Sequence, residues 1–494
     1  MKSIYAIRRK FVLLQAIVFL IALFYEYSIQ EAHNYSLILF YSLWNGISYL
    51  WLFYNELKFA PDFHPYQILA LISAQFIGFN GVNCYLELIE GNNLYFGSAL
   101  INDAMFLGII YLSLQHLLLF GVFYFLEHKN RKRNHTSLKL GDKIRQSKIE
   151  YFDWGIRFYL FVWSMRIISL IIPLASISSI LVSITNIGHI VTLFLLTFAM
   201  IQYPMRSRAK YCHWIIVVLE IILVMNHGMK EEIIRTLVPY CIYILISYKA
   251  GFLSFRISTI LNMSFIAVFV VFFVFPYVSI FRNISITTGR SWNDISTSEA
   301  LSEYSKYINK EGIYAYDEEE RGAGYLMSRA GAIDCNAFSI DYAKKHGTSP
   351  EFLAYCGMAL IPRIIWPSKP SVVLGGMAYA LATGDENWAQ AKSSESYGNS
   401  VSLGYIGSCY FSLGFLGSIF LILFHSFFIW YLWNFLKQKM LYNLVALWAF
   451  SGFVFLLLKD FESFSDCGFN FVVFNIIYIL LCKFVYKGPK KLVD

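Results

Sequence analysis

A succession of about twelve apolar runs constrains the fold of this chain more than any other feature. The runs lie near residues 11–29, 35–54, 66–87, 104–127, 155–175, 178–203, 212–227, 232–249, 258–281, 412–435, 441–459 and 469–486. A helix needs roughly 20 apolar residues to cross a bilayer, and lipid offers no hydrogen bonds to an exposed backbone, so runs of this length predict transmembrane helices. The composition agrees, because 57% of the residues are apolar and only 15% are charged. We therefore expect an all-α polytopic membrane protein with about twelve transmembrane helices.

The basic residues indicate how such helices would be oriented. Lys and Arg collect at residues 2–10, 129–148 and 206–210, which fall on one side of the membrane if every run spans it. Short cytoplasmic loops carry an excess of Lys and Arg, so this side is expected to be the cytoplasm, with both termini there. The net charge of +8 is then mostly a topological signal. We expect membrane lipids, and no nucleic acid, as partners of these basic loops.

One long polar segment separates the ninth and tenth runs and divides the chain into three parts. These are residues 1–281 with transmembrane helices 1–9, residues 282–411 as a large periplasmic loop, and residues 412–494 with helices 10–12. The loop is expected to be partly helical, because residues 296–309 and 333–346 have helical patterns and Ser296 can cap the first of them. The sequence leaves open whether Cys335 and Cys356 form a disulfide.

The first candidate site lies in this loop, in the segment Ile361-Pro-Arg-Ile-Ile-Trp-Pro-Ser-Lys-Pro370. Its prolines restrict the backbone around Arg363 and Lys369. Arg offers a planar fork of donors that matches phosphate, and Lys adds a point charge, so the pair suits a diphosphate. Trp366 and Tyr397 are candidate surfaces for stacking on sugar rings. The alternative is a rigid turn whose cations meet lipid head groups.

Further cations face outward in the expected topology. Lys230 and Arg235 follow the turn between the seventh and eighth runs, where a helix N-terminus would add its dipole and free amides to an anion site. The other candidate diphosphate ligands are Arg282, Arg290, Arg321 and Arg329. The run Asp317-Glu-Glu-Glu320 is a poor metal site, because consecutive carboxylates point in different directions. We expect no metal.

Charged residues within the runs are costly in lipid and by default suggest function. Arg157 and Arg166 lie in the fifth run, and Glu220 lies in the seventh. The plain alternative to function is that such residues pair inside the helix bundle. His189 is expected to be a satisfied bundle residue.

A family resemblance follows from the late outward loop, the Ile361–Pro370 segment and the later Gly404-Tyr-Ile-Gly-Ser-Cys-Tyr-Phe-Ser-Leu-Gly-Phe-Leu-Gly417. Together they resemble the Wzy-type polymerases of O-antigen and capsular repeat units. The resemblance implies a GT-C-like fold and a lipid-carrier-dependent glycosyltransferase that uses neither a metal, a cofactor nor a nucleotide sugar. Lys230 stands where an arginine would be expected in the outer turn.

The resemblance also implies a reaction, a place and partners. A growing glycan would move from one undecaprenyl diphosphate to the non-reducing end of another, on the periplasmic face of the bacterial inner membrane. The implied partners are undecaprenyl-diphosphate-linked oligosaccharides, a flippase and a chain-length regulator.

The residues are compatible with such a transfer. Breaking the bond between an anomeric carbon and a diphosphate requires stabilisation of the departing charge, which Arg and Lys can supply. The attacking sugar hydroxyl needs a base, and the outward-facing carboxylates are Glu395, Asp385, Asp460 and Glu462. The sequence leaves open which of them acts, the sugars and linkage, the retaining or inverting outcome, and the oligomeric state.

Two other functions fit a similar topology. An O-antigen ligase-like transferase would share the late loop and an outer arginine, but the loop offers only His346 as an outward histidine. A non-enzymatic flippase of lipid-linked oligosaccharides would be expected to show internal repeats. The halves of this sequence show no repeat, and its one large outer loop has no inner counterpart.

Overall fold

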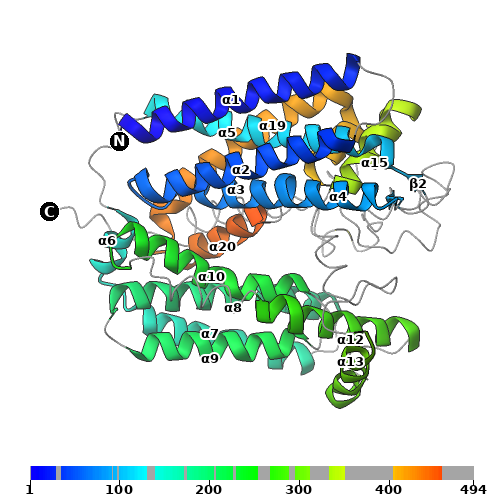
Figure 1. Cartoon of the computed structure of the whole chain (residues 1–494). Coiled ribbons are helices and arrows are strands. Elements are labelled where there is room, and N and C mark those ends of the chain that lie inside the picture. Colours follow the sequence, from blue (N-terminus) through cyan, green and yellow to red (C-terminus); the bar gives the residue numbers. More distant parts are fainter. Residues whose placement is uncertain are drawn as a thin grey trace. The chain divides into compact units, whose positions relative to one another are not determined.

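The computed structural model places the helices in two compact units. The described residues are 2–28, 35–91, 93–96, 99–130, 139–171, 175–204, 207–225, 230–253, 268–288, 295–311, 333–350, 366 and 404–458. Unit 1 comprises Met1–Ser137 and Gly331–Asp494, and unit 2 comprises Leu138–Ala330. Unit 2 is therefore inserted into the sequence of unit 1, and each unit has its own packed helices (Figure 1).

Unit 1 consists mainly of long apolar helices. In chain order they are α1 (Lys2–Ser28), α2 (Tyr35–Phe59), α3 (Pro65–Ser73), the π-helix η1 (Ala74–Phe79), α4 (Asn80–Ile89), the 3-10 helix η2 (Asn102–Ala104), α5 (Met105–Asn130), α15 (Ile333–His346), α19 (Tyr405–Lys439) and α20 (Leu444–Leu458). A small antiparallel pair of strands, β1 (Tyr95–Phe96) and β2 (Ala99–Leu100), precedes η2. Among the described residues, this pair is the one departure from the predicted all-helical fold.

Five segments of the described chain are helical, long and apolar enough to cross a membrane. They are Ile4–Ser28, Tyr35–Phe59, Pro65–Ile89, Asn102–Lys129 and Tyr405–Lys437. These segments correspond to the first four predicted runs and the tenth. The structure thus supports a helical membrane protein, as the composition predicts.

The helices of unit 1 pack closely where glycine faces glycine. A Cβ atom added at Gly78 would lie 2.5 Å from the Cα atom of Gly46, so α2 and η1 touch through their backbones. One turn on, a Cβ atom at Gly81 would lie 2.0 Å from the Ser42 hydroxyl oxygen. Small residues commonly allow such an approach in membranes, and π-helices such as η1 are irregularities within longer helices.

The helix α19 is broken at Gly414, which has φ 69° and ψ −166°. The Tyr405 hydroxyl donates to the carbonyl of Leu421 at 3.2 Å, and the rings of Tyr405 and His425 lie 4.5 Å apart. In an unbroken helix, 16 residues would separate Tyr405 from Leu421 by about 24 Å. The chain therefore reverses at Gly414, and the half-helix 405–413 runs back along the following span.

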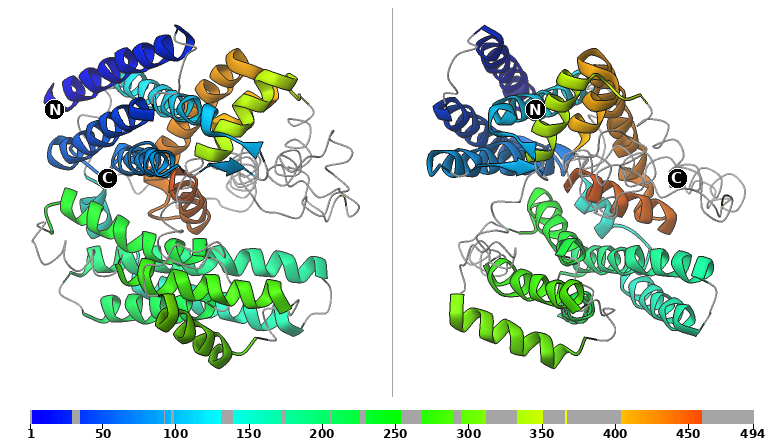
Figure 2. Two further views of the ribbon diagram at one scale, coloured as in Figure 1. Left: turned by 45° about the vertical axis from the view of Figure 1, so that its right-hand side comes forward. Right: turned by 90° about the vertical axis from the view of Figure 1, so that its right-hand side faces the viewer.

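The Gly404–Gly417 segment is therefore not one continuous helix. Gly414 adopts a left-handed conformation that favours glycine, so it ends one helix and begins another. The start of the half-helix is held by two other elements, because the amides of Ile406 and Gly407 donate to Gln115 Oε1 of α5 at 3.1 Å and to Asn336 Oδ1 of α15 at 3.0 Å. Figure 2 shows α15 beside α19 from two directions.

Unit 2 is a second helical bundle. Its elements are α6 (Leu140–Arg145), α7 (Tyr151–Ile171), α8 (Ala175–Gln202), α9 (Ser207–Met225), α10 (Lys230–Lys249), the π-helix η4 (Val270–Val274), α12 (Phe275–Thr288) and α13 (Thr297–Glu311). Glycines let α7 and α8 approach, because a Cβ atom at Gly188 would lie 2.6 Å from a Val162 methyl group. Buried Leu193 and Leu196 of α8 cluster with Ile216 and Val217 of α9.

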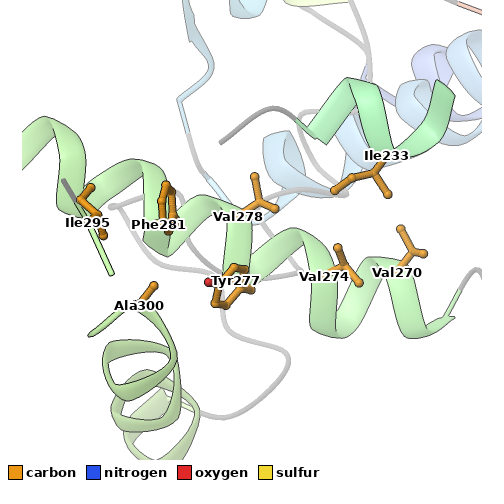
Figure 3. Close-up of a cluster of buried hydrophobic side chains, with 8 residues drawn as sticks. All are labelled: Ile233, Val270, Val274, Tyr277, Val278, Phe281, Ile295 and Ala300. Carbon is orange, nitrogen blue, oxygen red and sulfur yellow. The ribbon is translucent and has the colours of Figure 1, made fainter. Parts of the chain in front are cut away.

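An apolar cluster joins α10, η4, α12 and α13 within unit 2 (Figure 3). Its members are Ile233, Val270, Val274, Tyr277, Val278, Phe281, Ile295 and Ala300. The helix α13 confirms the predicted helix near 296–309, and Ser296 caps it by accepting the Glu299 amide at 3.1 Å. The predicted helix at 333–346 is confirmed as α15, in which Cys335 is buried. Cys356 lies outside the described residues.

Candidate functional site

Most of the residues that the sequence nominates lie outside the part of the chain that the structure describes. These are Arg290, Arg321, Arg329, Arg363, Lys369, Asp385, Glu395, Tyr397, Asp460 and Glu462. Lys230 is the first residue of α10 and Arg282 belongs to α12. Trp366 is half-buried and has no regular secondary structure. Arg235 is the nominated cation whose surroundings the structure describes most fully.

Near Arg235, unit 2 contains an ion pair between the apolar helices α7 and α9. Arg166 donates from Nη1 to Glu220 Oε1 at 2.8 Å and from Nη2 to Glu220 Oε2 at 2.6 Å. The Tyr159 hydroxyl donates to the same Oε1 atom at 2.9 Å. A carboxylate can accept a bidentate arginine and further donors, so the enclosed Glu220 is well satisfied. The predicted pairing of charged residues inside the bundle is confirmed for Arg166 and Glu220.

Two further helices of unit 2, α8 and α10, contribute to the same cluster. The His189 Nδ1 atom of α8 lies 3.8 Å from Glu220 Oε2, and Nε2 lies 3.4 Å from the Thr236 hydroxyl of α10. Arg235, which precedes Thr236, is half-buried and lies within electrostatic range of the His189 ring. His189 is a buried bundle residue, as expected, but it also connects the ion pair to Arg235. We call Tyr159, Arg166, His189, Glu220 and Thr236 the Arg166 cluster.

Arg166 and Glu220 lie near the ends of α7 and α9, and Arg235 lies near the start of α10. Arg166 is five residues before the end of α7 at Ile171, Glu220 is five before the end of α9 at Met225, and Arg235 is five after Lys230. Five residues of helix correspond to about 7.5 Å, so the three groups lie at a similar depth. In the topology that the basic loops predict, this is the outward end.

Unit 1 contains a second ion-pair cluster, which the sequence analysis missed. Arg8 of α1 donates from Nε to Glu56 Oε1 at 2.6 Å and from Nη2 to Glu56 Oε2 at 2.8 Å. Its Nη1 atom donates to Glu127 near the end of α5, and its Cζ atom lies 4.1 Å from the centre of the Tyr66 ring. All three guanidinium nitrogens of Arg8 are therefore engaged.

His64 completes this second cluster in one defined protonation form. Its Nδ1 atom accepts the Tyr66 amide at 3.2 Å and so caps α3. Because Nδ1 acts as an acceptor, the ring proton lies on Nε2, which contacts Glu127. The charge of Lys437 in α19 also acts on Glu127. We call Arg8, Glu56, His64, Tyr66 and Glu127 the Arg8 cluster.

A sequence signal for the Arg8 cluster existed but was weak. Glu56 and Glu127 lie near the ends of apolar runs, where charged residues are common and usually face water. Their burial shows only when α1, α2 and α5 are packed together. Within the described residues, no group of three or more His, Cys, Asp or Glu side chains could hold a metal ion.

Comparison with known proteins adds no further information about the site. No protein-family model, no curated protein and no solved structure matches the chain.

Proposed function

We propose that this protein polymerises undecaprenyl-diphosphate-linked oligosaccharide repeat units into O-antigen or capsular polysaccharide. In this proposal the chain has about twelve transmembrane helices, both termini are cytoplasmic, and the loop 282–411 faces the periplasm of a bacterial inner-membrane enzyme. The observation that carries the proposal is the position of Arg235. This outer-turn cation lies half-buried beside the Arg166 cluster, where an anionic group on a membrane lipid could be bound.

The proposed reaction is a metal-independent glycosyl transfer. The hydroxyl oxygen at the non-reducing end of one lipid-linked repeat attacks the anomeric carbon of the donor glycan. The bond between that carbon and the diphosphate oxygen breaks, the diphosphate leaves with the bonding pair, and a base takes the hydroxyl proton. Arginine and lysine side chains stabilise the departing diphosphate. We assign this role to Arg235, with Lys230, Arg363 and Lys369 as further ligands.

Deletion of the gene, followed by electrophoresis of surface polysaccharide, tests the proposal. A polymerase mutant leaves a single repeat unit on the acceptor, and wild-type protein supplied in trans restores the ladder of chain lengths. Full-length chains retained on the lipid carrier would instead indicate a ligase. Repeat units accumulating on the cytoplasmic side would indicate a flippase, which the intramembrane ion pairs also suit. An unchanged ladder would contradict all three functions.

A further inference from the structure

We infer that His346, the last residue of α15, is the general base that takes the proton of the attacking sugar hydroxyl. The inference rests on the proposed function and assigns to one imidazole the role for which the sequence nominates four carboxylates. Those carboxylates lie outside the described residues, whereas the surroundings of His346 belong to the part of the chain that the structure describes.

The ring of His346 is held in one tautomer that leaves a nitrogen available. Its Nδ1 atom lies 3.2 Å from the carbonyl oxygen of Tyr342. A carbonyl oxygen can only accept, so Nδ1 carries the ring proton and the lone pair of the neutral ring lies on Nε2. No described residue forms a hydrogen bond or an ion pair with Nε2, and the side chain is exposed. A histidine in this form can accept a proton from a bound hydroxyl.

Aromatic stacking fixes the orientation of this ring. The ring centres of His346 and Tyr342 lie 4.3 Å apart with 28° between the ring planes. Tyr342 in turn stacks on Phe411 of the half-helix 405–413, with ring centres 5.6 Å apart and 20° between the planes. A ring held by a stack and a hydrogen bond loses less freedom when a substrate binds than a freely rotating side chain does. Catalytic groups need this kind of support from their neighbours.

The charges around His346 are compatible with proton acceptance. The C-terminal end of α15 carries partial negative charge from its free carbonyl groups, which favours an imidazolium ion there. Of the two lysines that precede His346, Lys345 is paired with Asp341 at 2.7 Å, and Lys344 lies over the ring of Tyr27. The half-helix that carries Phe411 has no charged residue.

Two contacts place His346 at the end of unit 1 that faces outward in the predicted topology. Thr348 lies at the reversal of α19, because a Cβ atom added at Gly414 would be 3.4 Å from its methyl group. Lys344 reaches the end of α1, with Nζ 5.0 Å from the centre of the Tyr27 ring. The other ends of α1 and α19 carry basic residues that are expected in the cytoplasm. His346 therefore lies on the side where the lipid-linked repeat units would be joined.

The proton transfer fits the proposed reaction without a further reactant. As the hydroxyl oxygen bonds to the anomeric carbon, its proton passes to Nε2 of His346. The bond from that carbon to the diphosphate oxygen breaks, and the diphosphate leaves with the bonding pair. The imidazolium ion then gives its proton to water, which restores the neutral ring for the next transfer.

Replacement of the imidazole tests this role. Variants of the full chain are expressed in the deletion strain, and the ladder of chain lengths is measured by electrophoresis. In His346→Ala we expect polymerisation to slow at least about 100-fold, which leaves a single repeat unit. Free imidazole in the growth medium should restore longer chains, because it can take the proton at the vacated place. A residue that merely ends the helix would show no such rescue.

Two further variants separate the chemistry from the hydrogen bond. His346→Asn keeps an N–H donor for the Tyr342 carbonyl but has no basic nitrogen, so it should lose the ladder as His346→Ala does. Lys345→Ala, at the exposed neighbouring position, is the matched control and should give the wild-type ladder. The yield of folded protein should be equal in all variants, because the His346 side chain is exposed.

The outcomes distinguish this inference from the proposed function. A wild-type ladder in His346→Ala or His346→Asn overturns the assignment of the base, and so does a ladder lost in His346→Ala that imidazole does not restore. Should His346→Ala fail to fold, His346→Asn decides alone. A ladder that is unchanged by deletion of the whole gene refutes the polymerase itself. A ladder that deletion removes and His346→Ala restores refutes only the base.

Discussion

The Arg8 cluster and the Arg166 cluster contain the same bidentate pair of arginine and glutamate, but differ in what surrounds it. Arg8 uses all three nitrogens on Glu56 and Glu127 and is 4% exposed, whereas Arg166 uses two nitrogens on Glu220 and is 21% exposed. An arginine whose donors are all satisfied inside the protein joins helices. Arg166 is less enclosed, and the described residues engage two of its three guanidinium nitrogens. A bidentate ion pair is therefore common to both clusters, and burial and the number of engaged nitrogens distinguish them.

Removal of the buried ion pair between Arg8 and Glu56 should have the largest effect on stability. Arg8→Ala leaves Glu56 buried without its cation, and breaking a buried pair in this way typically costs about 3–5 kcal/mol. We expect little folded protein and a strongly lowered unfolding temperature, measured by fluorescence-detected size exclusion and thermal unfolding. Arg9→Ala, the exposed neighbour, should behave as wild type. Equal behaviour of both variants would show that the Arg8 cluster does not stabilise the packing of α1, α2 and α5.

A lysine at each arginine sharpens the comparison. Lysine keeps the charge but lacks the planar fork. Arg166→Lys should leave the yield of folded protein nearly unchanged and lower polymerisation per folded molecule about tenfold, or about 1.4 kcal/mol in the barrier. Arg8→Lys should lower the yield of folded protein and leave polymerisation per folded molecule nearly unchanged, because the Arg8 guanidinium pairs with Glu56 and Glu127 inside the protein. The yield of folded protein and the ladder of chain lengths are measured for both variants. If both variants lose yield and activity in the same proportion, the two clusters do not differ in role.

The reversal in α19 should also stabilise unit 1, but by less than the Arg8 cluster does. Gly414→Ala places a Cβ atom at φ 69° and ψ −166°, a region that glycine alone adopts readily, which costs about 1–3 kcal/mol. Among the described residues the added atom would meet a Thr348 methyl group at 3.4 Å, an ordinary contact, so backbone strain dominates. Gly452→Ala in α20, where no atom from another part of the described chain lies within 4 Å of the added Cβ atom, should be neutral or stabilising. Thermal unfolding of both variants measures the difference, and destabilisation of Gly452→Ala to the same extent would argue against strain as the cause.

The smallest effect is expected from the donor that supports Glu220. Tyr159→Phe removes one of three hydrogen bonds to the carboxylate and leaves the Arg166 pair, so the loss should be about 1 kcal/mol. Tyr211→Phe on the exposed face of α9 is the matched control. The unfolding temperature should fall slightly in Tyr159→Phe and stay unchanged in Tyr211→Phe. A large loss of stability in Tyr159→Phe would indicate that the tyrosine, rather than Arg166, holds the Glu220 carboxylate.

Much of the local structure could be predicted from the sequence. The first four membrane-length helices follow from runs of apolar residues, and the helices at 296–309 and 333–346 follow from periodicity and a Ser296 cap. These features depend on neighbours within a few residues. For the site, the sequence nominated Arg235 and raised function or pairing for Arg166 and Glu220, but it did not predict that these three side chains would be neighbours.

The apolar runs are enough to predict a helical membrane protein, because their length suits a bilayer and requires no tertiary contact. Which charged side chains are fully enclosed and which are partly exposed depends on the tertiary structure. Residues 8, 56 and 127, or 166, 220 and 235, meet through the packing of separate helices, and this depends on side chains far apart in the chain. The same applies to Gly414, where the contacts of Tyr405 with Leu421 and His425 show that an apolar segment is a reversal and not one straight span.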